Sequence, residues 1–263
     1  MKLSDYVIEC IANAGAHDVF MLPGGGAMHL NDSLGRSDSV RYICNLHEQA
    51  CAIAAEAYAQ YTNNIGVCMV TTGPGSVNAL TGVAAGWMDS TPMLVVSGQV
   101  KRADLCHGKG IRQLGFQEID IVSMVKPITK YAVTIKEPSE VRYHMEKALW
   151  LARNGRPGPS WVDIPLDVQA AEIDPSTQEG FSPNKTDTAR TIDPDSLSKK
   201  VQDVLMLLGQ SERPVMLIGN GVRLANSENA FLELAGRLQV PVLTTWKALD
   251  LLTQDDPLFV GRP

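Results

Sequence analysis

The segment His47-Glu48-Gln49 carries residue types that could do acid–base chemistry. It directly follows a predicted buried strand, residues 40–44, and begins an Ala-rich helix that extends to about residue 61. A carboxylate among apolar side chains is costly unless it has a partner or serves a reaction. The alternative is an ordinary acidic residue in a first helical turn, which the helix dipole favours. The segment alone marks Glu48 as a candidate and leaves both interpretations open.

A second candidate is the glycine-rich loop Thr71-Thr-Gly-Pro-Gly-Ser76, which lies between a predicted strand and a helix. A nucleoside-triphosphate loop needs a lysine that neutralises phosphate charge, and none follows here, so we do not expect such a ligand. The loop either presents backbone amides at a helix N-terminus to a polar ligand or forms only a tight turn.

Other signatures of catalytic or cofactor sites are incomplete. Gly219-Asn-Gly221 begins like a dinucleotide-binding turn, but Leu224 occupies the position of the third glycine, which favours a close-packed turn. The sequence has no GxSxG nucleophile motif and no HExxH metal motif, and its five histidines are scattered. We therefore expect no metal site within this chain.

The elements that must position these residues alternate along the chain. Short apolar segments at 18–22, 40–44, 67–71, 92–96 and 160–164 predict strands, and helical patterns lie between them. This order predicts a mostly parallel sheet with helices on both faces, a three-layer α/β/α domain. Ligands of such folds bind at the carboxyl ends of strands, where the loops after Leu22, Cys44, Thr71 and Ser97 must lie.

The chain of 263 residues is long enough for one to two domains. We predict a first domain over residues 1–170 and a linker rich in Asp, Glu, Pro, Ser and Thr over 171–194. Residues 195–263 then predict the first half of a second, Rossmann-like α/β domain, with strands at 214–218 and 241–245.

Composition excludes several classes of protein. The net charge of −6 gives no basic surface for nucleic acid or acidic membranes. No apolar stretch reaches the roughly 18 residues of a membrane span, and Lys2, Asp5 and Glu9 exclude a signal peptide at the N-terminus. The five cysteines lack zinc-ligand spacing, so we expect reduced thiols and a cytoplasmic protein.

Taken in order, the motifs resemble those of thiamine-diphosphate-dependent enzymes of the acetolactate synthase type. The resemblance covers residues 1 to about 170, the family's N-terminal pyrimidine-binding domain, and from Gly219 the opening of its central domain. The segments that carry it are Pro23-Gly-Gly-Gly-Ala27, His47-Glu-Gln-Ala50, Thr72-Gly-Pro-Gly-Ser-Val-Asn78, Asp89-Ser-Thr-Pro92, Ser97-Gly-Gln-Val100, Gly115-Phe-Gln-Glu118, Ile128-Thr-Lys130, Gly155-Arg-Pro-Gly-Pro159 and Val162-Asp-Ile-Pro165.

The resemblance implies a role for Glu48. In this family a glutamate at the matching position hydrogen-bonds N1′ of the cofactor's aminopyrimidine. The shared proton promotes the imino tautomer, which deprotonates the thiazolium ring for attack on a 2-keto acid. The expected activity is that of a carboligase or decarboxylase, a transferase or lyase.

Further site residues follow from the resemblance alone. Gln99 is expected as a second catalytic residue that approaches the substrate side, and Arg156 matches an arginine that contacts FAD in members that bind it. The remaining expected cofactor contacts are Pro23, Gly24, Gly25, Thr72, Gly73, Pro74 and Asn78, and the expected substrate contacts are Gly26, Ala27, Phe116 and Gln117. Gln113-Leu-Gly115 departs from the Thr-Asp-Ala of the typical synthase, which bears on the choice of keto acids.

The family's segment for Mg²⁺ and the diphosphate has no counterpart here, so Mg²⁺ ligands are expected outside this chain. The resemblance also implies a homodimer or homotetramer whose active site is shared between subunits. Three interpretations remain: the N-terminal portion of a longer enzyme, the pyrimidine-binding subunit of a split decarboxylase, or a noncatalytic binding remnant. The first is favoured, because a remnant has no need of the acid at position 48.

Overall fold

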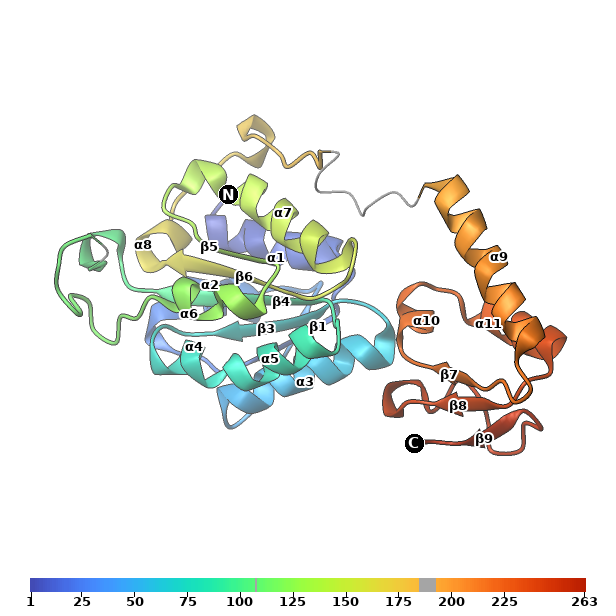
Figure 1. The fold of residues 1–263 in the computed structure, drawn as a ribbon. Coiled ribbons are helices and arrows are strands. Elements are labelled where there is room, and N and C mark those ends of the chain that lie inside the picture. Colours follow the sequence, from blue (N-terminus) through green and yellow to red (C-terminus); the bar gives the residue numbers. More distant parts are fainter. Residues whose placement is uncertain (107, 185–192) are drawn as a thin grey trace. The chain divides into compact units, whose positions relative to one another are not determined.

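The computed structural model describes residues 1–106, 108–184 and 193–263 (Figure 1). The chain divides into two compact units, Met1–Arg190 and Thr191–Pro263. The first unit holds every candidate site residue that the sequence suggested.

The first unit is built on a six-stranded parallel sheet in the order β2-β1-β3-β4-β6-β5. The strands are β1 (Asp18–Met21), β2 (Arg41–Cys44), β3 (Gly66–Val70), β4 (Met93–Gln99), β5 (Tyr131–Thr134) and β6 (Pro159–Pro165). The chain goes from β1 out to β2 and then back past β1 to β3, so the strand order reverses between β1 and β3. Ligands of open α/β sheets bind at such a reversal, outside the carboxyl ends of the strands.

Helices cover both faces of this sheet, which confirms the predicted three-layer α/β/α fold (Figure 1). One face is covered by α1 (Leu3–Asn13), α2 (Met28–Gly35), α7 (Val141–Arg153) and α8 (Leu166–Gln169). The other is covered by α3 (Glu48–Thr62), α4 (Pro74–Asn78), α5 (Leu80–Met88) and α6 (Ile121–Val125).

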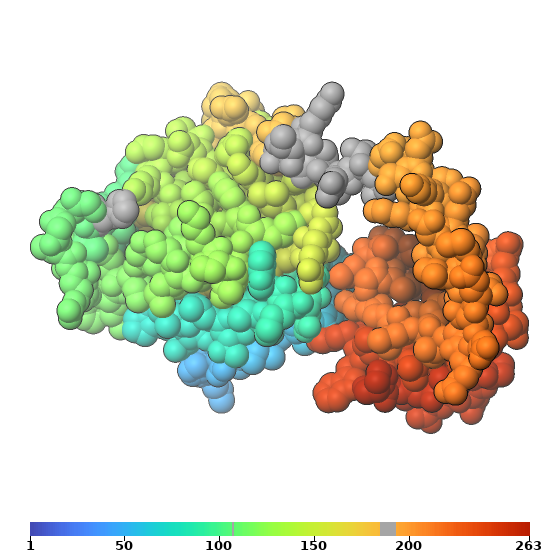
Figure 2. All heavy atoms as spheres, viewed as in Figure 1, coloured from blue at the N-terminus to red at the C-terminus, as the bar shows by residue number. Residues whose placement is uncertain are grey.

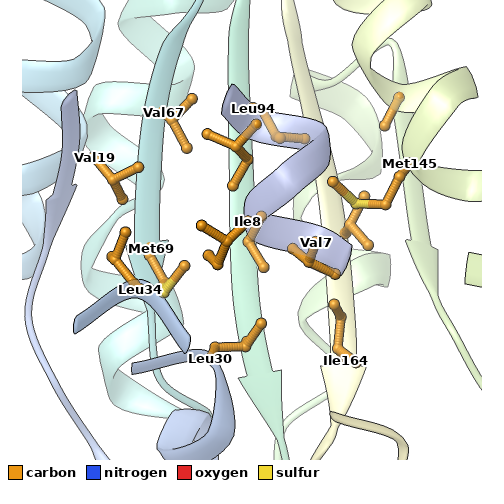
Figure 3. Close-up of a cluster of buried hydrophobic side chains, with 14 of the residues drawn as sticks. Val7, Ile8, Val19, Leu30, Leu34, Val67, Met69, Leu94, Met145 and Ile164 are labelled. Carbon is orange, nitrogen blue, oxygen red and sulfur yellow. The ribbon is translucent and has the colours of Figure 1, made fainter. Parts of the chain in front are cut away.

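Two apolar clusters hold the helices to the sheet, one on each face. Val67 and Met69 of β3 point into the cluster under α1, α2 and α7, which Figure 3 shows, whereas Cys68 and Val70 point into the cluster under α3 and α5. This alternation is the period of two that a strand buried on both faces requires. All four side chains are fully buried, which explains why β3 reads as a continuous apolar run.

Strand β5 was not predicted from the sequence. Its four residues are only half-buried, because β5 is the edge strand beside β6. Tyr-Ala-Val-Thr is too short and too mixed to stand out as an apolar run. The predicted single helix after β3 is instead two helices, α4 and α5, joined at Ala79.

Part of the predicted linker packs on the first unit. The amide of Leu3 donates to the carbonyl of Ala171, and that of Ile173 donates to the carbonyl of Met1. The ring of Phe181 packs against Tyr143 and Trp150 of α7. The domain boundaries of the sequence analysis stay a prediction.

The second unit contains a three-stranded parallel sheet in the order β7-β8-β9. Its elements are α9 (Pro194–Gln210), β7 (Met216–Ile218), α10 (Gly221–Leu224), α11 (Glu228–Leu238), β8 (Val242–Thr244) and β9 (Phe259–Gly261). Strand β9 was not predicted, since it has only three residues and is half-exposed. The turn Gly219-Asn-Gly221 leads from β7 into α10, but close packing does not explain its glycines, because a Cβ at Gly221 would meet nothing within 4 Å.

The segment between β4 and α6, green in Figures 1 and 2, projects from the body of the first unit; residue 107 in it lies outside the described residues. Among the described helices, none is both long enough and apolar enough to cross a membrane.

Candidate functional site at the carboxyl ends of the strands

Glu48 is the first residue of α3 and follows the carboxyl end of β2. Helix α3 begins there because the His47 side chain caps it, accepting the Gln49 amide hydrogen on Nδ1 at 3.1 Å. The Glu48 side chain is only 8% exposed. Its Oε2 accepts a hydrogen bond from Nδ2 of Asn78 at 3.0 Å. Helix α4, which follows β3, therefore supplies the partner of the acid after β2.

The backbone of Gly75 passes close to the other carboxylate oxygen. A Cβ at position 75 would lie 3.2 Å from Oε1 of Glu48 and 2.7 Å from Cγ2 of Thr71, so only glycine allows this approach. Within the described residues no hydrogen-bond donor reaches Oε1. Oε1 is also not among the enclosed polar atoms that lack a partner, so it keeps some exposure and can accept from a donor carried by a ligand.

The loop from Pro23 to Ala27 lies against the loop after β3. The Gly26 amide donates to Oγ1 of Thr71 at 3.0 Å, and the Gly26 carbonyl accepts from Nε2 of Gln169 at 2.7 Å. A Cβ at Gly24 would lie 2.4 Å from Cγ2 of Thr71, which explains the glycine. Pro23 and Gly25 are exposed, whereas Ala27 is fully buried.

Thr72 joins this loop to Gln99 at the end of β4. The Thr72 hydroxyl donates to Oε1 of Gln99 at 2.6 Å, and the amide of Val100 donates to the same oxygen at 3.0 Å. Nε2 of Gln99 donates to the Ile119 carbonyl at 3.0 Å and to Oδ2 of Asp163 at 3.2 Å. Gln99 is 2% exposed, and its whole amide is engaged inside the protein.

Gly73 and Gln117 meet where the loop after β3 approaches the segment before α6. Gly73 has φ +63°, and a Cβ there would lie 2.1 Å from the carbonyl oxygen of Gln117. Only glycine fits this combination of left-handed backbone and close approach. Phe116 is 84% exposed beside this contact, and Pro74 is exposed at the start of α4.

Arg156 lies elsewhere. It precedes β6, and its Nε donates at 2.7 Å to Oγ of Ser90, which precedes β4. Because the strands are parallel, both residues lie at the amino-terminal edge of the sheet, opposite to Glu48. A cavity of about 520 Å³ at this edge is lined by Arg156 together with Lys130, Trp87 and Met88.

Two buried side chains that support these loops were missed by the sequence analysis as site residues. Asp163, on β6, accepts hydrogen bonds from Gln99 and Ser97, and Gln169 holds the Gly26 carbonyl. Asp163 lies in the motif Val162-Asp-Ile-Pro165, but Ser97 and Gln99 are more than 60 residues away from it in sequence. Burial raises the pKa of the Asp163 carboxyl to about 7.

No group of three or more His, Cys, Asp or Glu side chains that could hold a metal ion is found in the described part of the chain. The carboxyl-end cluster formed by Glu48, Asn78, Gly75 and the two glycine loops thus offers a buried acid and close backbone approach.

Comparison with known proteins agrees with this arrangement. Residues 1–124 match the family model described as the thiamine pyrophosphate enzyme N-terminal TPP binding domain, and residues 201–263 match that of the thiamine pyrophosphate enzyme central domain. The chain is similar to the probable acetolactate synthase large subunit of Methanocaldococcus jannaschii, with 36% identity over 263 residues.

Two further relatives are similar over nearly the whole chain. They are the acetolactate synthase large subunit of Lactococcus lactis, 34% identical over 259 residues, and the chloroplastic acetolactate synthase 2 of Zea mays, 36% identical over 262 residues. The aligned part is 98–99% of this chain but only 43% of the two microbial proteins and 39% of the maize protein. The chain thus spans about two-fifths of the length of these relatives.

Proposed function

The chain belongs to the thiamine pyrophosphate enzymes, and from this premise we propose that it is the amino-terminal portion of an acetolactate synthase-like carboligase or decarboxylase of 2-keto acids. The observation that carries the proposal is Glu48, a buried residue with one carboxylate oxygen held by Asn78 and the other without a hydrogen-bond donor among the described residues.

The residues at the carboxyl ends of β2 and β3 fit an aminopyrimidine ring. Asn78 fixes the orientation of the Glu48 carboxylate, so that Oε1 would be ready to bind a ring nitrogen without reorganisation. The glycines at positions 73 and 75 let the loop after β3 lie close beside a flat ring. Thiamine diphosphate, when bound, supplies the electron sink that allows a 2-keto acid to lose its carboxylate.

Glu48 would hold a proton at the pyrimidine N1′ and keep it there during turnover. A buried site favours this role, because a proton shared between carboxylate and ring nitrogen is not lost to bulk water. The backbone of Gly26 is held on both sides, because its amide donates to Thr71 and its carbonyl accepts from Gln169. Gly26 would border the reacting carbonyl group of the substrate. The hydrogen bond between Thr72 and Gln99 holds the loop after β3. Phe116 and Gln117 would contact the substrate.

Two further groups belong to the proposal. Mg²⁺ and the diphosphate would be held by residues of a further domain, within a homodimer or homotetramer whose subunits share the site. The edge cavity with Arg156, Lys130 and Trp87 combines two cations with an aromatic ring, which suits an anionic, planar ligand such as FAD. Five free cysteine thiols support a cytoplasmic location.

The test replaces Glu48 by Gln in the complete enzyme and measures decarboxylation of a 2-keto acid such as pyruvate. We expect turnover to fall at least about 100-fold, the lower range for loss of a proton-transfer group. Glu56→Gln is the matched control, because Glu56 lies on the same helix, is 7% exposed and accepts a hydrogen bond from Thr91. Retained activity in the Glu48 variant, or equal losses in both variants, would overturn the proposal.

A further inference from the structure

We propose that Asp163 is a positioning residue whose ionisation strengthens the hydrogen bonds of Gln99 and, through it, of Thr72, and thereby holds the start of the loop after β3, which carries Gly73. This role deepens the proposed function, on which its relevance to catalysis rests.

The carboxyl group of Asp163 is a hub of hydrogen bonds inside the sheet. Its side chain is 1% exposed. Oδ1 accepts from the Ser97 hydroxyl at 2.6 Å, and Oδ2 accepts from the Thr134 hydroxyl at 3.0 Å and from Nε2 of Gln99 at 3.2 Å. The three donors come from β4 and β5, the strands on either side of β6. Such an arrangement is complete only when the carboxyl group acts purely as an acceptor.

Gln99 connects the Asp163 carboxyl group to the loop after β3 through hydrogen bonds. One Nε2 hydrogen goes to Asp163 and the other to the Ile119 carbonyl, which fixes the amide orientation. That orientation points Oε1 at the Thr72 hydroxyl, 2.6 Å away. Thr72 in turn adjoins Gly26, where a Cβ would lie 2.8 Å from Cγ2 of Thr72. A chain of direct contacts thus connects the acid on β6 to both glycine loops.

Protonation of Asp163 weakens this pattern. A proton on Oδ2 needs an acceptor, and the Thr134 hydroxyl can rotate to accept it, whereas Nε2 of Gln99 can only donate. The Gln99 amide cannot turn to accept this proton without bringing its oxygen against the Ile119 carbonyl and its Nε2 against the Val100 amide. Gln99 therefore keeps its orientation but loses its charged acceptor, and because hydrogen bonds to a charged acceptor are stronger, the hold on Gln99, and through it on Thr72, is weakened.

Asp163 changes its protonation state near neutral pH. Burial raises the pKa of Asp163 to about 7, opposed by the hydrogen bonds from Ser97, Gln99 and Thr134, and the charge of Asp120 raises it further. Asp163 borders a cavity of about 480 Å³, whose other ionisable lining groups are Cys106, Glu118, Asp120 and Lys136. Among these, the Glu118 carboxylate is engaged by the backbone amides of Cys106, Leu114 and Gly115.

The test is an NMR titration of the chain of residues 1–263 from pH 5 to 9. It follows the Asp163 carboxyl carbon, the Gln99 side-chain amide, the backbone amides of Thr72 and Gly73, and the indole N–H of Trp161, which donates to Ser97 Oγ. We expect all these signals to move with one shared midpoint near the pKa of about 7. In Asp163→Asn the signals of Gln99, Thr72 and Gly73 should stay constant over the same range.

Asp120→Asn provides the matched control. It keeps the cap of α6, since Asn also accepts the Ser123 amide hydrogen, but it removes a charge that raises the pKa of Asp163. The shared midpoint should therefore move to lower pH and persist. The titrations of the wild-type chain and of Asp120→Asn still test the proposal if Asp163→Asn does not fold.

Two outcomes would overturn the proposal: signals of Gln99 and Thr72 that stay fixed while the Asp163 carboxyl titrates, or a response that survives unchanged in Asp163→Asn. The titration needs neither cofactor nor turnover, so its failure is separate from failure of the Glu48 test above.

Discussion

The buried acid at position 163 predicts an unusual dependence of stability on pH. Its pKa is about 7 in the folded chain against a reference value of 3.8, with burial as the main cause. Between these two values the folded state binds a proton that the unfolded state has released. Stability must therefore fall as the pH rises from about 4 to about 7, the reverse of an acid held by an ion pair.

The size of this effect follows from the pKa difference. The shift is about three units, and each unit corresponds to about 1.4 kcal/mol, so the contribution of Asp163 to the free energy of unfolding changes by about 4 kcal/mol across this range. Asp163→Asn removes the ionisable group and should remove this slope. The substitution also changes the hydrogen bonds, which shifts the stability at every pH but leaves the difference in slope intact.

The assay is urea unfolding of both chains at several pH values between 4 and 8, followed by tryptophan fluorescence. Trp246→Phe in both backgrounds confines the signal to the first unit, because the other three tryptophans lie there. His144 has a pKa lowered mainly by burial, so its own contribution rises with pH, and only the difference between the two chains isolates Asp163. Equal slopes in the two chains would refute the assignment of a raised pKa to this residue.

Two further predictions concern the packing of α5 on α3 and the hydrogen bond that holds the Gly26 carbonyl. Gly82→Ala places a Cβ 2.5 Å from the backbone of Ala52, where α5 crosses α3, and should destabilise the first unit by about 1–3 kcal/mol in urea unfolding. Gly209→Ala, on the open end of α9, meets nothing within 4 Å and should instead stabilise its helix by up to about 1 kcal/mol, so equal effects would contradict the packing argument. Gln169→Leu leaves the Gly26 carbonyl without its donor, at a cost of about 1–3 kcal/mol, and should speed hydrogen exchange at the Gly26 amide; unchanged exchange would contradict its role in holding that loop.

The sequence was most informative where one local pattern decides the structure. Strand β3 reads as an apolar run because both faces of the sheet are covered, and Glu48 stands out because it follows β2 and begins a helix of small apolar residues. The resemblance to a known family then suggested which loops approach it. The structure places Asn78 in contact with Glu48, and the roles of the individual residues remain predictions.

The sequence was least informative about partners that only the fold brings together. Gln169 reaches Gly26 across 143 positions, and Asp163 meets Ser97 across 66, so no local pattern marks either side chain. Strand β5 was missed because its four residues are only half-buried and carry no continuous apolar signal. The prediction of a buried strand at 40–44 was wrong about burial, since β2 is the other edge strand and its four residues are exposed. Arg156 follows a recognisable motif, yet parallel pairing places it at the sheet edge opposite to Glu48.

The central claim is that Oε1 of Glu48 faces N1′ of a bound aminopyrimidine, and a binding cycle tests it most directly. The affinity of the complete enzyme for thiamine diphosphate is compared with that for an analogue in which CH replaces N1′, in the wild type and in Glu48→Ala. If the two groups meet, replacing N1′ weakens binding to the wild type by about 10- to 150-fold, the range of a hydrogen bond to a charged group, and has little effect in the variant. An equal loss in both proteins would show that the carboxylate and the ring nitrogen do not interact.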